Sequence, residues 1–330
     1  MSRIRYIAFR TVQSIALVFL VLTFLFFFFR LMPGSFLDRM VFDGASPEAI
    51  ANFKEKWGLN DPLHVQYYRY MVNVFNGDFG TSIQFREPVW DVVGDKIFNS
   101  FVLVAPAVTL AYVLGSLLGL KMGTSRGSVL EKYGNLVLLS FGTIPGFYLG
   151  ILIIIIFSGW LGWFPTSGMT SAETATQFAG AAWWRKYFTV DFLKHYILPF
   201  STILLLQLYY PSLIMRTSVV ETKDQDFIQY HRLKGLSDGK LLQYVGKHSI
   251  LPVITMYPIS LSRALSGLVL VEVVFNWPGI GFALFRGVLA RDFPVVQFVF
   301  FIVAVFIIFG NFIVDIAYGI IDPRVSVDSD

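Results

Sequence analysis

Residues of the types that carry catalysis or bind metals are few in this chain, and they are not grouped into known catalytic motifs. There is no cysteine, which excludes disulfides, thiolate metal sites and cysteine nucleophiles. The histidines do not form a His-Glu-x-x-His run or a close metal-binding pair, and no Gly-x-Ser-x-Gly elbow is present. They are His64, His195, His231 and His248. We therefore expect no catalytic residue, no bound metal and no enzymatic activity.

A phosphate-binding loop for ATP is also missing. Such a loop needs an early glycine and then Gly-Lys followed by serine or threonine. The chain has Gly239-Lys240 and Gly246-Lys247, but Leu241 and His248 follow them and neither pair has the earlier glycine. We expect this chain to hold no ATP and no other cofactor.

Long apolar blocks are the elements that must position any site. The chain has 330 residues, of which 55% are hydrophobic and 15% charged, whereas a soluble domain is about a quarter charged. A hydrocarbon core about 30 Å thick takes about 20 residues of helix, and lipid leaves the backbone no other partner. These lengths predict an all-α membrane protein with six transmembrane helices. The spans lie at about 11–29, 100–120, 135–158, 196–215, 250–273 and 296–319.

Lysine and arginine near the span ends predict the orientation in the membrane. Basic residues gather before the first span, after the second, after the fourth and after the sixth, and these segments share one side. We expect that side, with both termini, to be cytoplasmic in a multi-pass protein of the cell membrane. The first span is too long for a signal peptide core of about 7–15 residues, so we expect an uncleaved anchor. The opposite side also carries some bases: Arg185, Lys186, Arg286 and Arg291.

The domain plan follows from these spans. Residues 1–30 are predicted to hold the N-terminal tail and first span, 31–98 an extracytoplasmic region, 99–320 a core with five spans, and 321–330 a cytoplasmic tail. Within 31–98, Pro47-Glu48 and Asp61-Pro62 are typical of helix starts or turns. Two interpretations of this region stay open: a solvated cap with a small core, or a docking surface for an external protein.

The cytoplasmic segment at about 216–249 is long for a simple connection. Residues Asp226 to Leu233 are predicted to form a short helix with Phe227, Tyr230 and Leu233 on one face. The rest of the chain offers little to cover that apolar face. Either a partner covers it, or the helix lies on the lipid surface.

Two further signals complete a helix–turn–helix unit. Gly235 stands where a C-cap glycine ends a helix. Ser237 is suited to cap a second helix that runs to Ile250, and Pro252 follows.

Several runs of residues stand in the order and spacing of one known family. In the cytoplasmic segment these are Asp226-Phe227-Ile228, Arg232-Leu233-Lys234-Gly235-Leu236-Ser237 and Ile250-Leu251-Pro252-Val253. Elsewhere they are Gly77-Asp78-Phe79-Gly80-Thr81-Ser82, Leu161-Gly162-Trp163-Phe164-Pro165, Glu272-Val273-Val274-Phe275-Asn276-Trp277-Pro278-Gly279, Arg291-Asp292-Phe293-Pro294 and Asp322-Pro323-Arg324. Together they resemble permease subunits of binding-protein-dependent ABC importers, in the dipeptide, oligopeptide and nickel branch, over nearly the whole chain.

The resemblance implies a type I ABC importer permease fold and a set of partners. These are a second, related permease, two cytoplasmic ATPase subunits that bind the ATP, and an external substrate-binding protein. The short helix would insert into a groove on the ATPase and transmit its motion to the pore. The implied coupling residues are Asp226, Phe227, Tyr230, Arg232, Leu233, Lys234 and Gly235. Peptides, nickel or short sugars are carried by members of this family, so the cargo stays open.

The chain departs from the family at a few positions. Tyr230 and His231 stand where small residues are usual, and Lys247-His248 replaces an Arg-Asn type of pair. Arg263 falls inside the fifth span, where an apolar residue or glycine is expected. These departures concern the details of coupling and of the pore.

Polar residues inside the spans are costly and usually face a partner or a cavity. Arg263 lies roughly 18 Å along the fifth span, and Asn311 and Asp315 lie roughly 15 and 9 Å from the cytoplasmic end of the sixth. Two interpretations stay open: pairing that locks the two spans together, or lining of the path to meet a peptide carboxylate. Glu272 is half a turn out of phase with Arg263 and is expected at the outer mouth.

One alternative from another class is an ion-coupled secondary transporter that works without ATPase partners. Such carriers are built from inverted repeats with broken helices. Neither half of this chain resembles the other, which favours the ABC permease.

Overall fold

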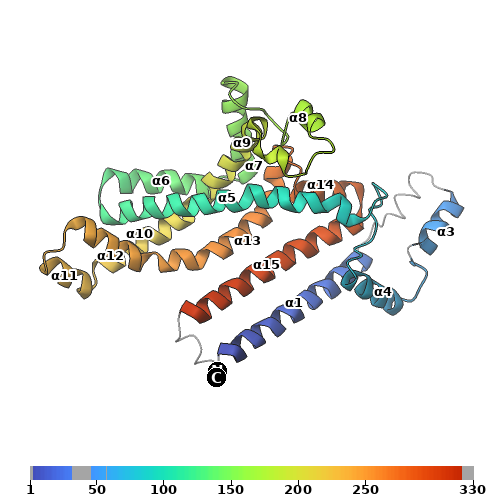
Figure 1. Ribbon diagram of the computed structural model, residues 1–330, viewed down its shortest axis with the longest axis horizontal. Helices are drawn as coiled ribbons and strands as arrows, with labels where there is room; N and C mark the ends of the chain where they lie inside the picture. Colours follow the sequence, from blue (N-terminus) through green and yellow to red (C-terminus); the bar gives the residue numbers. More distant parts are fainter. Residues whose placement is uncertain (1–2, 32–45, 57, 322–330) are drawn as a thin grey trace. The chain divides into compact units, whose positions relative to one another are not determined.

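The computed structural model describes residues 3–31, 46–56 and 58–321 (Figure 1). These residues form helices and connections without a named strand; Thr81 and Pro88 make an isolated antiparallel bridge. The predicted all-α class is therefore confirmed. The chain divides into two compact units, one made of Met1–Asn99 with Gly279–Asp330 and the other of Ser100–Pro278.

The first unit contains the first and the last of the described helices. Its helices α1 and α15 lie side by side (Figure 1), and α14 packs on α15. Its helices are α1 (Arg3–Leu31), α3 (Pro47–Lys56), α4 (Leu63–Phe75), the start of α5 (Val89–Thr124), α14 (Ile280–Ala290) and α15 (Phe293–Ile321). A buried core of aliphatic side chains joins α5, α14 and α15: Val89, Val93, Ile280, Val295 and Val299.

The segment before α5 is fixed by one buried carboxylate. Asp292, between α14 and α15, is 1% exposed and accepts a hydrogen bond from the Ser82 hydroxyl. It also accepts the backbone N–H groups of Ile83 and Gln84 at 3.1 and 3.2 Å. A buried carboxylate needs such donors, because desolvating an unpaired charge is very unfavourable. Two of the family-like runs thus contact each other.

The second unit holds the remaining helices. They are the rest of α5, α6 (Val129–Thr143), α7 (Gly146–Ile153), a π-helix (Ile154–Trp160), α8 (Ala172–Gln177), a 3-10 helix (Arg185–Phe188), α9 (Val190–Gln207), α10 (Tyr209–Lys223), α11 (Asp226–Leu233), α12 (Asp238–Ser249) and α13 (Leu251–Val274). Buried residues of α5, α6 and α9–α10 form a core in this unit: Ala111, Met122, Leu138 and Leu208.

A stripe of glycines on α5 lets α10 approach closely. Gly115, Gly119 and Gly123 recur every fourth residue and so share one helix face. A Cβ atom on Gly115 would lie 2.7 Å from Cγ of Pro211, and one on Gly123 would lie 2.7 Å from Cγ1 of Val219. Small residues at an interface allow this close backbone packing between membrane helices.

Every predicted span coincides with apolar helix. Four helical stretches are long and apolar enough to cross a membrane, and the count among the described residues rises to six if each of two bent pairs is one span. The straight ones are Arg5–Leu31, Val89–Thr124, Val190–Lys223 and Phe293–Ile313, and the bent pairs are Val129–Thr143 with Gly146–Trp160 and Leu251–Leu265 with Gly267–Val274.

The prediction of one continuous helix over 135–158 was wrong. Helices α6 and α7 meet at an angle of 105°. Ile144, between them, has the extended backbone angles φ −68° and ψ 134°. The ring of Pro145 disfavours helical geometry in the residue before it, so the helix breaks there.

Other boundaries also differ from the expected ones. Helix α5 starts at Val89, directly after Pro88, instead of near residue 100, and α10 continues to Lys223 beyond the expected end at 215. The helices expected after Pro47 and Pro62 are present as α3 and α4. The tail at 321–330 lies outside the described residues, apart from its first one.

Candidate functional site

The segment between α10 and α13 folds as the two short helices that the sequence predicts. Helix α11 spans Asp226–Leu233 and α12 spans Asp238–Ser249. Gly235 between them has a φ of +78°, and its N–H donates to the Arg232 carbonyl oxygen at 3.0 Å. No atom lies within 4 Å of a Cβ placed on Gly235. The left-handed backbone, and not lack of space, therefore requires glycine at this turn.

The start of α12 is close to the prediction. Ser237 occupies the N-cap position, and its carbonyl oxygen accepts the N–H of Leu241 at 3.0 Å. Its side chain makes no capping hydrogen bond. The helix ends at Ser249, and Pro252 follows in the first turn of α13.

The buried side of α11 differs from the predicted one. The sequence places Phe227, Tyr230 and Leu233 on one exposed apolar face. In the structure Ile228 is 1% exposed and Phe227 is half-buried, with its ring 4.8 Å from that of His248. The prediction that Phe227 is exposed was wrong, because Phe227 and Ile228 both turn toward the unit.

Next to them, His231 turns inward as well. Its ring stacks on that of Tyr244 in α12 at 4.8 Å and 25°. Tyr230 and His231, which stand where the family usually has small residues, therefore differ in their surroundings. His231 fastens α11 to α12, whereas Tyr230 stays outside, 56% exposed.

The outward side of α11 carries an apolar and basic group that we call the α11 tip: Tyr230, Leu233 and Lys234. Leu233 is 87% exposed. The ammonium of Lys234 lies 4.3 Å from the centroid of the Tyr230 ring, a cation–π contact. Asp226 and Arg232 are also exposed. The tip therefore presents apolar area and positive charge on a short helix that is held from its other side.

Helix α12 connects the tip to the body of the unit. Leu241, Val245 and Ser249 are its buried residues. The Ser249 hydroxyl donates to the hydroxyl oxygen of Thr222 in α10 at 3.0 Å, and both groups are buried. Helix α12 packs on α10, and α11 packs on both, so packed helices connect the tip to α10.

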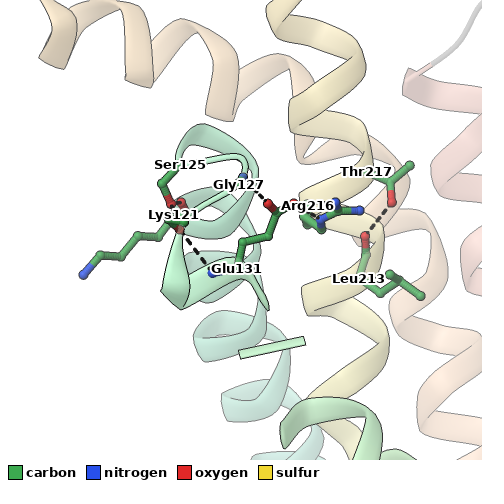
Figure 2. Close-up of polar contacts among 8 residues, drawn as sticks. Lys121, Ser125, Gly127, Glu131, Leu213, Arg216 and Thr217 are labelled. Carbon is green, nitrogen blue, oxygen red and sulfur yellow. Dashed lines mark hydrogen bonds and ion pairs between the residues drawn. The ribbon is translucent and has the colours of Figure 1, made fainter. Parts of the chain in front are cut away.

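An ion pair ties α10 to the turn between α5 and α6 (Figure 2). The Arg216 guanidinium donates to Oε1 of Glu131 through Nε at 2.8 Å and also through Nη2. The other carboxylate oxygen accepts the Gly127 N–H at 2.5 Å, and the Glu131 N–H donates to the Ser128 hydroxyl at 3.2 Å. The Ser128 hydroxyl thus caps α6, and the Glu131 carboxylate reaches back to the N–H of Gly127, one residue before that cap. Charge-assisted hydrogen bonds of this kind are stronger than neutral ones, so the pair firmly links α10 to the start of α6.

Two of the polar residues predicted inside the spans, Arg263 and Asp315, have partners within their own units. The Arg263 guanidinium lies 5.6 Å from the ring centroid of Tyr210. Asp315 lies 3.5 Å from Nε of Arg10, and Asn311 is exposed on α15. Arg263 belongs to one unit and Asp315 to the other, so the predicted pairing between their spans stays a prediction.

Glu272 is fully buried in α13. The Ser100 hydroxyl donates to its Oε1 at 2.5 Å. Its position at an outer mouth stays a prediction. Its burial with a hydroxyl donor is the usual arrangement for a carboxyl group away from water.

Comparison with known proteins decides the family. The chain matches the family described as binding-protein-dependent transport system inner membrane component over residues 111–327. Residues 3–104 match the N-terminal part of such membrane components. The chain belongs to this family. It is a permease subunit of a binding-protein-dependent ABC importer, as the resemblance of its motifs predicts.

Similar permeases match along nearly their whole length. The oligopeptide transport system permease protein AppB of Bacillus subtilis is 31% identical over 97% of this chain and 98% of its own. The glutathione transport system permease protein GsiC of Salmonella typhimurium is 30% identical over 98% and 99%. A putative peptide transport system permease protein of Brucella abortus is 30% identical over 97% and 98%.

Family membership fixes several properties of the permease. It is a multi-pass membrane protein that works with a substrate-binding protein and ATPase subunits. The comparisons give no support to a secondary transporter that acts without them.

The bonds of Arg216 with Glu131 and the glycine stripe of α5 were not predicted. The Gly-x-x-x-Gly spacing would have revealed the stripe, whereas an ion pair 85 residues apart leaves no local signal.

Proposed function

We propose that this permease supplies half of the translocation path of a peptide importer and that a second, related permease supplies the other half. The supporting observation is that full-length relatives are named for oligopeptide, glutathione and peptide transport. Two ATPase subunits bind the ATP, and this chain has no catalytic activity and no cofactor of its own. Both termini and the α11–α12 segment face the cytoplasm.

The α11 tip is the contact with an ATPase subunit in this proposal. What supports it is the exposure of Tyr230 and Leu233 on a helix whose opposite side is buried. Exposed apolar patches of this kind mark interaction sites. The basic residues Arg232 and Lys234 beside them favour an acidic rim on the ATPase groove.

Transmission to the membrane runs through α10. The buried hydroxyl pair of Ser249 and Thr222 joins α12 to α10, and Arg216 joins α10 to α6. A stiff element whose position both sites bias meets the physical requirement for coupling. ATP binding moves the ATPase, the α11 tip moves with it, and α10 carries the motion to the path.

Reconstitution tests the proposal. The permease, its companion permease, both ATPases and the binding protein are placed in proteoliposomes, and uptake of a labelled peptide is measured with and without ATP. We expect ATP-dependent uptake that is lost when this permease is omitted. The isolated permease should neither bind nor hydrolyse ATP. Hydrolysis by the contaminant-free subunit, or uptake by the subunit alone, would contradict the assignment.

A further inference from the structure

A short aromatic and basic segment precedes the membrane helix α9. Residues Trp183 to Phe188 read Trp-Trp-Arg-Lys-Tyr-Phe, and the last four form a 3-10 helix. Trp183 is 56% exposed, Trp184 48% and Phe188 82%. This segment, Trp183–Phe188, is called the interfacial segment below. Its exposed rings are large, and α9 begins two residues after it.

The interfacial segment is held firmly from its inner side. The Tyr187 ring makes an edge contact with Phe192 at 5.3 Å, and the Phe192 ring lies 5.9 Å from that of the fully buried Trp277. Thr189 caps α9 by accepting the Phe192 N–H at 3.0 Å, and it donates to the Lys186 carbonyl oxygen at 2.9 Å. The outward rings are therefore presented by an ordered support.

Two cations lie among the exposed rings. The Arg185 guanidinium is 5.9 Å from the centroid of the Trp184 ring, and the Lys186 ammonium is 5.2 Å from that of Tyr187. No acidic residue occurs between Glu173 and Asp191. The Asp191 carboxylate accepts the Ser171 N–H at 2.7 Å and lies 3.6 Å from His195 Nδ1. The local charge on the interfacial segment is thus positive.

Cations beside tryptophan and phenylalanine, at the start of a membrane helix, have the chemistry that suits a phospholipid headgroup layer. Tryptophan and tyrosine are enriched at membrane–water interfaces, and arginine and lysine attract anionic headgroups. The exposed Val190 at the start of α9 continues the apolar surface of the rings toward the hydrocarbon. A soluble partner would have to cover this surface while leaving α9 in lipid.

We propose that the interfacial segment binds anionic phospholipid headgroups, with Trp183, Trp184 and Phe188 seated at the headgroup level and Arg185 and Lys186 on the phosphates. Lysine and arginine are enriched in cytoplasmic loops, whereas Arg185 and Lys186 are predicted on the opposite side. Binding to anionic headgroups explains why these two basic residues are present there. It anchors the connection between α8 and α9 and keeps the start of α9 at a fixed depth. The proposal does not depend on the cargo or on which compartment this side faces.

The depth of the segment is measured first. Because the chain has no cysteine, Ala182→Cys gives the full-length permease in nanodiscs one spin label beside the segment. Oxygen partitions into lipid and a nickel chelate stays in water, so their relaxation effects report depth. We expect the ratio of the oxygen effect to the nickel-chelate effect to be higher at position 182 than at a control label from Glu48→Cys on α3. Trp184→Ser should move the label at 182 toward water.

Lipid preference is measured second. Full-length permease is purified from mixed phosphatidylcholine and phosphatidylglycerol vesicles, and retained lipids are counted by native mass spectrometry. We expect preferential retention of phosphatidylglycerol, reduced about five-fold by Arg185→Gln or Lys186→Gln, since each cation near an anionic surface contributes on that scale. Lys54→Gln removes the same charge on α3 and should leave retention unchanged.

Several results would overturn the proposal. One is a label at 182 that is as open to the nickel chelate as the label at 48. Another is equal phosphatidylglycerol retention in wild type, Arg185→Gln and Lys186→Gln. A third is protection of the label at 182 only when the external binding protein is added, which would assign the segment to that protein. Circular dichroism of each variant separates these results from misfolding.

Discussion

Arg216 of α10 donates two hydrogen bonds to a single carboxylate oxygen of Glu131, whose other oxygen accepts the Gly127 N–H just before α6. One carboxylate thus accepts a backbone N–H at the start of α6 and also links α6 to α10. The ion pair joins α6 to α10, the helix on which α11 and α12 pack. If motion passes from the segment into the membrane, this link determines how much of it reaches α6.

Arg216→Leu should leave the Glu131 carboxylate without its charged partner. Hydrogen bonds to charged groups contribute about 1.5–3 kcal/mol each, so the variant should unfold at a lower temperature in detergent. Uptake should fall more than ATP hydrolysis, because α10 loses its link to α6. Melting temperature, hydrolysis and uptake are measured on the assembled transporter.

Lys121→Gln is the matched control for that experiment. Lys121 is exposed at the end of α5, and its side chain points away from the ion pair (Figure 2). Removing its charge should change neither melting nor uptake. Equal uptake in wild type and Arg216→Leu would show that the pair has no part in coupling.

Gly235→Val should leave a folded permease in the membrane and weaken its ATPase coupling. The left-handed φ of +78° is strained for a β-branched residue, by roughly 1–2 kcal/mol. The turn would rearrange and displace the α11 tip. Pull-down of the ATPase subunits, hydrolysis and uptake are compared with wild type.

Gly239→Val separates backbone strain from bulk at that turn. Gly239 lies in α12, and a Cβ there also has nothing within 4 Å, but its φ is not positive. The control should be tolerated, because valine is no worse than glycine inside a helix, and it should keep ATPase association. If both variants couple normally, the left-handed turn has no role in transmission.

Leu233→Ala and Ile228→Ala should have opposite effects, although they lie on the same short helix. Leu233 is 87% exposed and Ile228 is 1% exposed. Truncating Ile228 should destabilise the unit by about 2–5 kcal/mol through a core cavity. Truncating Leu233 should leave the melting temperature unchanged and weaken ATPase binding. Pull-down and thermal melting of both variants check this, and full ATPase binding by Leu233→Ala would refute the α11 tip as a contact.

Hydropathy predicted the helices because apolar length is a local property of the sequence. Helix α11 and the Gly235 turn were also predictable, since an end glycine and a short periodic run are local signals. The face of α11 was not, because a helix of eight residues with apolar groups at Phe227, Ile228, Tyr230 and Leu233 has no single apolar stripe. Which side of α11 packs inward depends on α12, where His248 contacts Phe227 and Tyr244 stacks on His231.

The break at Ile144-Pro145 was missed for a different reason. A proline inside an apolar stretch predicts a kink, but Pro106 and Pro199 lie inside continuous helices while Pro145 ends one. Ile144 before Pro145 has extended backbone angles, whereas the helix continues through Pro106 and Pro199. The ion pair in the candidate site could not be predicted either, because its two residues are far apart in the sequence. Glu131 and Arg216 each look like ordinary charges near a span end.

Two substitutions at Arg263 should show whether its guanidinium stabilises the fold or binds the transported peptide. Arg263→Lys keeps the charge but loses the planar contact with Tyr210. If Arg263 locks spans together, Arg263→Leu should lower the melting temperature. If it meets a peptide carboxylate, Arg263→Lys should assemble normally and lose uptake of free peptides more than of C-terminally amidated ones. Wild-type melting and uptake in both variants would reject both roles.

The glycine stripe of α5 gives the last prediction. A Cβ on Gly119 would meet the Ser212 carbonyl oxygen and lie 2.8 Å from Cβ of Met215. Neither can move without shifting α10, so Gly119→Ala should push α10 away from α5 and strain the ion pair of Arg216. We expect a lower melting temperature and reduced coupled uptake from one added methyl group. Gly267→Ala is the matched control, because that glycine of α13 has nothing within 4 Å of a Cβ. It should be tolerated or slightly stabilising, since alanine favours helix over glycine by about 1 kcal/mol. Thermal melting and uptake in proteoliposomes check both variants, and equal melting temperatures for the two would show that α5 and α10 have room to part.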